Sequence, residues 1–105
     1  MADKLPHTAR DAADAHPEVW RAYQALGEAC TDAGPLTGET LRLVKLALAI
    51  ASGSEGAVHS HVRRALDEGV GADALEHAAI LAIPTIGWPQ AMAALSWIRD
   101  ITRGT

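Results

Sequence analysis

Residues 53–66 read GSEGAVHSHVRRAL and combine the signals of a helix start with two closely spaced histidines. Ser54 is a residue type that commonly caps a helix N-terminus, and Ala, Val and Leu follow it at helical spacing. Gly69 is typical of a helix C-terminus. We therefore predict a helix that starts at Ser54 and ends at Asp67 or Glu68.

The same start and stop signals divide the rest of the chain into helices, with no run of β-branched residues that would indicate a strand. We expect these further helices: Thr8–Ala15, one from Pro17 to the AGPL stretch, one capped by Thr37 and reaching Ser52, Gly71–Ile83, and one starting at Pro89 after a break over residues 84–88. The predicted fold class is all-α, a helical bundle of about five to six helices.

Composition limits the protein classes that remain. With 105 residues and 49% hydrophobic content, we expect residues 1–105 to form a single domain. A net charge of -4 without a basic face argues against nucleic acid as a partner, and no apolar run is long enough for a membrane span. We expect a cytoplasmic protein. Cys30 is the single cysteine, so an intrachain disulfide is excluded.

The two histidines of the opening stretch fall on different faces of the predicted helix. At about 100° per residue, His61 shares a face with Val58, Val62 and Ala65 and should point inward. It is either a hydrogen-bonded core histidine or a functional group. His59 should lie on the outer side, solvated and partnered by Glu55 one turn away. We expect His77 to be a boundary residue.

Beyond single residues, the order of segments from Leu36 to Leu95 is informative. An apolar helix is followed by a small-residue turn, a helix with His61 and then RRALDEG, and PTIGWP before a last helix. This order resembles the core repeat of the carboxymuconolactone decarboxylase family, which includes the AhpD-like alkylhydroperoxidases. The resemblance implies an AhpD-like bundle that assembles as a homo-oligomer.

The peroxidase branch of that family has the motif C-x-x-C-x-x-x-H, with a glutamate on the preceding helix. By resemblance, the cysteine positions fall on Ser54 and Ala57, the histidine on His61 and the glutamate on Arg42. Only the histidine is retained. A family-level alkylhydroperoxidase assignment stays open, but we do not expect thiol peroxidase activity, because the thiolate chemistry requires the cysteines.

In the decarboxylase branch of the family, the comparable stretch resembles the pattern E-x-x-x-x-x-H-x-R-x-A-L. Residues 55–66 match this pattern. The favoured hypothesis is an acid/base catalyst of lyase or isomerase type for a small anionic or carbonyl compound. His61 and Glu55 are its candidate catalytic residues, and Arg42, Lys45 and Ser54 its candidate substrate-binding residues. The alternative is a non-catalytic, oligomeric small-molecule-binding protein, in which Arg42 serves as an ion-pair partner.

The helix that includes Leu41 to Ala51 is apolar on nearly all of its sides. Because such a helix needs to be buried on every side, it indicates that copies of the chain associate. We expect self-association, as a hexamer first and a trimer second. The resemblance points the same way, since family members form trimers or hexamers. We assign no cofactor and no metal site, and leave open whether His59, His61 or His77 binds a metal.

Overall fold

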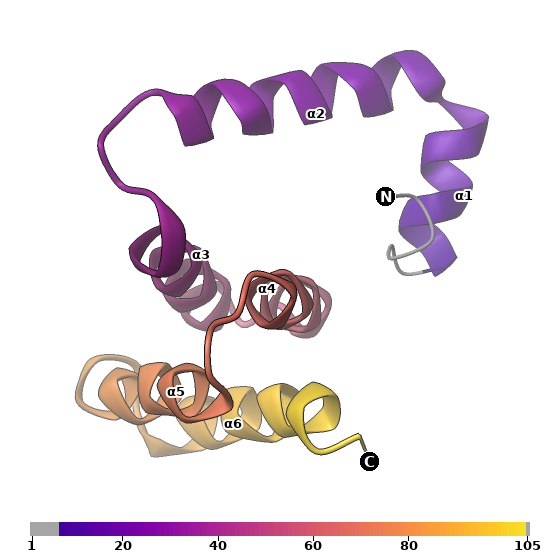
Figure 1. Ribbon diagram of the computed structural model, residues 1–105. Coiled ribbons are helices and arrows are strands. Elements are labelled where there is room, and N and C mark those ends of the chain that lie inside the picture. The colour runs from indigo at the N-terminus through magenta and orange to yellow at the C-terminus, as the bar shows by residue number, and fades with distance from the viewer. Residues whose placement is uncertain (1–6, 105) are drawn as a thin grey trace. The chain divides into compact units, whose positions relative to one another are not determined.

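The computed structural model describes residues 7–104, and within this range it contains six α-helices and no strand (Figure 1). The helices are α1 His7–Ala15, α2 Pro17–Asp32, α3 Gly38–Ser52, α4 Glu55–Asp67, α5 Ala72–Ile86 and α6 Trp88–Thr102. The predicted all-α class is therefore confirmed. The chain divides into two compact units, of which the first contains α1 and α2 and the second contains α3 to α6.

The first unit is a pair of helices with little buried surface. Pro17 opens α2, where its missing N–H and fixed φ suit the first helical turn. The rings of Trp20 and Tyr23 lie 5.8 Å apart on this helix, while Ala13 of α1 is buried. Val19 and Tyr23 remain exposed, so the apolar side of α2 is largely open to solvent.

The second unit has a continuous apolar core to which all four of its helices contribute. Each of α4 and α5 packs against both α3 and α6. The buried core residues are Leu46, Ala49, Ile50, Val58, Val62, Ala65, Val70, Leu75, Ala79, Ala94, Leu95 and Ile98. Since α4 has a neighbour on each of two sides, it places side chains on two separate flanks.

Both ends of α4 are fixed by local hydrogen bonds, as predicted. The backbone N–H of Ala57 donates to Ser54 Oγ over 3.2 Å, which is an N-cap. At the other end Gly69 has a φ of +87°, and the N–H groups of Gly69 and Val70 donate to the carbonyls of Leu66 and Ala65 over 3.0 and 2.9 Å. These two bonds form a Schellman motif, which needs a left-handed residue such as glycine.

The predicted end of α5 at Ile83 is wrong, because the helix continues through Pro84 to Ile86. A proline fits helical φ and removes only one donor, which is tolerable near the end of a helix that is packed on both sides. The break comes at Gly87, with a φ of +96°, and its N–H donates to the Ile83 carbonyl over 3.0 Å. The next helix, α6, then starts at Trp88 rather than at Pro89.

The surface of α3 is as apolar as the sequence indicates. Leu46 and Ile50 are buried, but Leu48 is 63% exposed and Val44 is also exposed. Among the helices of residues 7–104, none has the length and apolar character that crossing a bilayer requires.

Candidate functional site

The two histidines of α4 lie on different flanks of the helix. Two residues along a helix correspond to a rotation of about 200°, so neighbours two positions apart face nearly opposite ways. The charged groups that act on His61 include Arg42 and Lys45 of α3. The partner of His59 is Asp100 of α6. The packing of α4 between α3 and α6 thus gives each histidine a different environment.

His61 is half-buried, and its ring nitrogen Nδ1 is shielded from solvent without a hydrogen-bond partner among the described residues. The prediction that this side chain points inward is confirmed. Burial, acting together with the positive charges of Lys45, Arg64 and Arg42, lowers the pKa of His61 from 6.5 to about 4. The imidazole is therefore neutral at pH 7, with an unused buried nitrogen.

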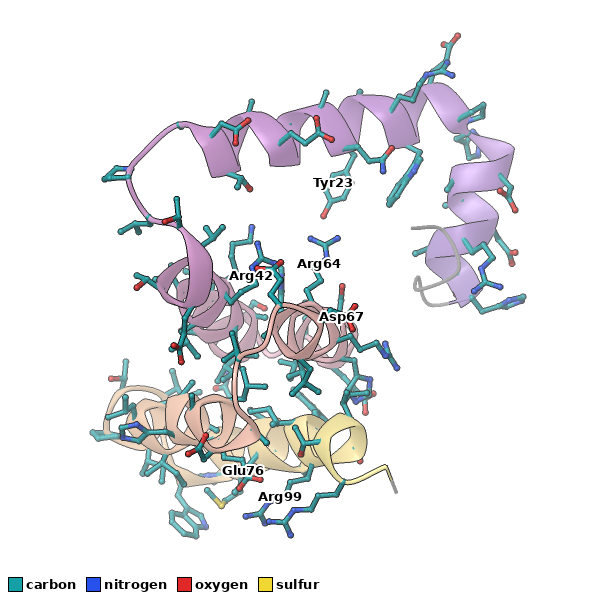
Figure 2. All side chains as sticks on the ribbon, in the orientation of Figure 1. Tyr23, Arg42, Arg64, Asp67, Glu76 and Arg99 are labelled. Atoms are coloured by element: carbon teal, nitrogen blue, oxygen red, sulfur yellow. The ribbon has the colours of Figure 1, made fainter. Side chains whose placement is uncertain are left out.

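Arg42 is buried although it is charged, with a side chain only 9% exposed. Its Nε lies 3.6 Å from Glu68 Oε1, which is an ion pair but too long for a hydrogen bond, and this Nε has no hydrogen-bond partner in the part of the chain described. Figure 2 shows Arg42 from α3 and Arg64 from α4 extending to the same side of this helix pair. We call His61, Arg42, Lys45 and Arg64 the His61 cluster.

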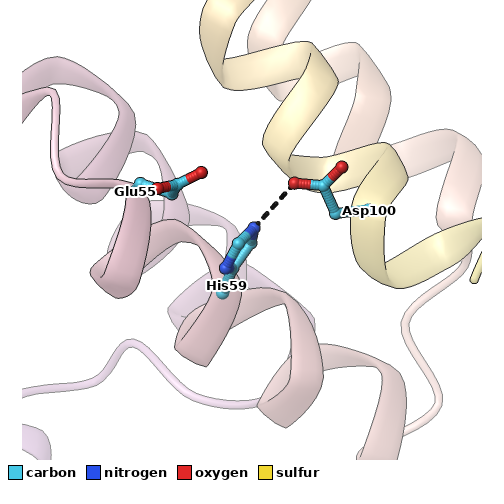
Figure 3. A group of neighbouring side chains, drawn as sticks. All are labelled: Glu55, His59 and Asp100. Atoms are coloured by element: carbon cyan, nitrogen blue, oxygen red, sulfur yellow. Dashed lines mark hydrogen bonds and ion pairs between the residues drawn. The ribbon is translucent and has the colours of Figure 1, made fainter. Parts of the chain in front are cut away.

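The prediction that His59 lies solvated on the outer side of its helix is wrong. Its side chain is 22% exposed, and Nε2 donates a hydrogen bond to Asp100 Oδ2 over 3.0 Å (Figure 3). Glu55 lies beside this pair, and one ligand atom from each of the three residues lies within 4.8 Å of the others. The expected pairing with Glu55 alone missed α6, which covers this flank of α4.

The remaining candidate residues have simple structural settings. Ser54 is exposed, and its hydroxyl caps α4. Lys45 is half-buried on α3, and His77 is exposed on α5 rather than at a boundary. Glu55 is grouped with His59 and Asp100, so its catalytic role beside His61 stays a prediction, as does a substrate contact by Ser54.

Two residues of these sites were missed from the sequence. Arg64 follows His61 by three positions on one helix, a spacing that brings side chains together and could have identified it. Asp100 is 41 positions away from His59, and no local pattern connects them. Its place beside α4 depends on the packing of α6.

Comparison with known proteins gives the family. Residues 17–100 match the model of the Carboxymuconolactone decarboxylase family. The chain belongs to this family. No curated protein and no solved structure matches the chain. The match to the Carboxymuconolactone decarboxylase family includes every residue of the His61 cluster, together with Glu55, His59 and Asp100.

Proposed function

We propose that the protein is an acid/base catalyst of lyase or isomerase type, which binds a small anionic or carbonyl compound at the His61 cluster. The observation that supports this most directly is the buried Nδ1 of His61, which has no hydrogen-bond partner in the described chain and has three cationic side chains nearby. An unsatisfied buried polar atom costs about 1 to 3 kcal/mol, so it is uncommon without a use.

The charges of the cluster favour an anion. Protonated His61 is repelled by the positive charges of Arg42, Lys45 and Arg64. A carboxylate or enolate bound among these four side chains would offset the repulsion between their positive charges. Cationic groups fixed before the ligand arrives also stabilise negative charge that develops during a reaction, with no need to rearrange. The cluster thus provides an anion site and a proton acceptor side by side.

Binding of such an anion would also raise the pKa of His61. With no ligand its pKa is about 4, and an imidazole of that pKa is a weak base. A negative charge next to the ring favours the protonated form and raises this pKa toward neutrality. His61 would therefore accept a proton efficiently only when the substrate is present.

The second candidate function is non-catalytic binding of a small molecule by an oligomer of the same fold. It is favoured by the Arg42–Glu68 ion pair, because a guanidinium already paired at 3.6 Å has a structural role without any substrate. In this case the His61 cluster holds a ligand and no proton moves.

The test begins with binding. Full-length protein with isotope-labelled imidazole nitrogens is titrated with small mono- and dicarboxylates and with carboxymuconolactone, the compound in the family's name. We expect at least one of these to shift the His61 nitrogen signals, with the exposed His77 as the internal control. If none shifts His61 more than His77, the proposed anion site is wrong.

Turnover then separates the two candidates. Compounds that bind are followed for loss of starting material and for released carbon dioxide. The acid/base proposal expects turnover that His61→Gln abolishes and that the matched variant His77→Gln leaves unchanged. Binding without turnover of any bound compound supports the second candidate instead.

We also propose that the protein self-associates. In the second unit Leu48, Leu81 and Trp88 are each 62 to 63% exposed, and large apolar side chains at this exposure favour burial against another surface. A symmetric homo-oligomer, hexamer or trimer, would supply that cover with copies of the same chain.

A further inference from the structure

We propose that Glu55, His59 and Asp100 form a binding site for a divalent transition-metal ion such as Zn²⁺. These three residues, the α4–α6 trio, lie on the flank of α4 that faces α6 (Figure 3). The proposal is independent of the proposed function, because His61 faces α3 with its own set of charges.

The spacing of the ligand atoms suits a small ion. His59 Nε2 and Asp100 Oδ2 are 3.0 Å apart, and one ligand atom from each of Glu55, His59 and Asp100 lies within 4.8 Å of the others. In a tetrahedral zinc site with bonds of about 2.0 to 2.1 Å, neighbouring ligand atoms are about 3.3 Å apart. The His59–Asp100 pair is already close to this spacing. Glu55 is exposed at the first residue of α4, so a change of rotamer can bring its carboxylate closer.

The donor set suits the same class of ion. One imidazole nitrogen and two carboxylate oxygens are typical ligands of Zn²⁺ and of its first-row neighbours. On binding, the proton that Nε2 shares with Asp100 leaves to solvent or to Nδ1, and the ion takes its place between the two side chains. Two carboxylates then neutralise the charge of the ion.

The trio also leaves room for a further ligand. The Asp100 side chain is 43% exposed and that of His59 is 22% exposed, so the ion can enter from solvent and keep a water molecule in a fourth position. A bound ion would join the start of α4 to the end of α6, two helices that are separated by α5 in the chain. Such a link raises the stability of the second unit when the metal is present.

Glu55 distinguishes this proposal from a simple contact between helices. The hydrogen bond from His59 to Asp100 needs no third residue, and an exposed glutamate beside it would then contribute nothing specific. A metal site, in contrast, loses one of its three ligands when Glu55 is replaced. The experiment therefore depends on Glu55→Gln, a change at an exposed position that leaves the core intact.

The experiment uses tag-free, full-length protein in which His7 and His16, both exposed, are replaced by Gln to remove unrelated weak sites. The protein is stripped with a chelator and titrated with Zn²⁺ in a calorimeter. We expect one equivalent of Zn²⁺ per chain and a rise in the thermal midpoint. Co²⁺ bound at the same stoichiometry should show the visible absorption of a site with nitrogen and oxygen ligands.

The variants give the decisive comparison. Glu55→Gln and His59→Gln should each weaken Zn²⁺ binding at least about tenfold, since even indirect partners of metal ligands contribute that much. Glu39→Gln, at an exposed glutamate in the first turn of α3, is the matched control and should bind as the parent does. No saturable binding at one equivalent, or equal affinity in Glu55→Gln and the parent, would overturn the proposal.

Discussion

Lowering the pH from 7 to 4 should destabilise the protein through His61, and replacing His61 by Gln should remove that part of the acid response. The reason is the environment of the ring. Burial and the charges of Lys45, Arg64 and Arg42 all act against the protonated imidazole in the folded chain. In the unfolded chain the same imidazole is solvated and takes up a proton at its ordinary pKa.

The sign and size follow from the two pKa values. His61 has a pKa of about 4 when folded, against 6.5 ordinarily, so between these values the unfolded chain binds more protons. The free energy of unfolding therefore falls as the pH falls from 6.5 to about 4, and this group changes it no further below that. Because the ring is half-buried and water screens the cations, we expect a loss of about 1 to 2 kcal/mol rather than the full linkage value.

The assay is urea unfolding of metal-free protein at several pH values between 7.5 and 4, for the parent and for His61→Gln. Subtracting the two free energies cancels the titration of all other groups. We expect the parent to lose about 1 to 2 kcal/mol relative to His61→Gln across the window, and no such trend for the exposed control His77→Gln. A difference that stays constant with pH would refute the cationic, desolvated environment that we assign to His61.

The remaining predictions concern the core, the cap, the thiol and the assembly. Ile98 is fully buried, so Ile98→Ala should lower the free energy of unfolding in urea by about 2 to 5 kcal/mol, and a loss below that range would contradict its central position. Ser54→Ala should cost about 1 kcal/mol by removing the α4 cap, while Ser54→Asp should retain stability in the same assay. Peroxide and disulfide reduction assays should show no turnover, since Cys30 is exposed and alone; turnover lost in Cys30→Ser would disprove this. Light scattering should find a hexamer or trimer that Leu48→Asp weakens, and a stable species of 11.0 kDa would contradict self-association.

The ends of α4 could be predicted to within a residue because their signals are local. Ser54 caps a backbone amide three residues later, and Gly69 adopts a φ that other residues avoid, so both are visible in the sequence. The end of α5 could not be predicted in the same way. Pro84 is a strong helix breaker in isolation, but here packing against α3 and α6 maintains the helix for two further residues.

The His61 cluster was predicted in part, since His61, Arg42 and Lys45 were candidates and Arg64 was not. The inward direction of His61 follows from the spacing of Val58, Val62 and Ala65. The same reasoning failed for His59, because it assumes that a helix has a single buried face, whereas α4 has neighbours on two flanks. Asp100 lies beyond any local pattern, so the α4–α6 trio could not be seen before the packing of α6 was known.

The setting of Ser54 shows how the proposed chemistry differs from that of the cysteine-containing members that the chain resembles. There, the N-terminal amides of this helix would stabilise a thiolate. Here the Ala57 amide, at the position of the second cysteine, donates instead to the Ser54 hydroxyl, at the position of the first. That donor is already occupied by a structural cap. In the proposed function, the side chains of Arg42, Lys45 and Arg64 stabilise negative charge beside His61, so we expect acid/base chemistry on an anionic substrate rather than attack by a nucleophile at the helix start.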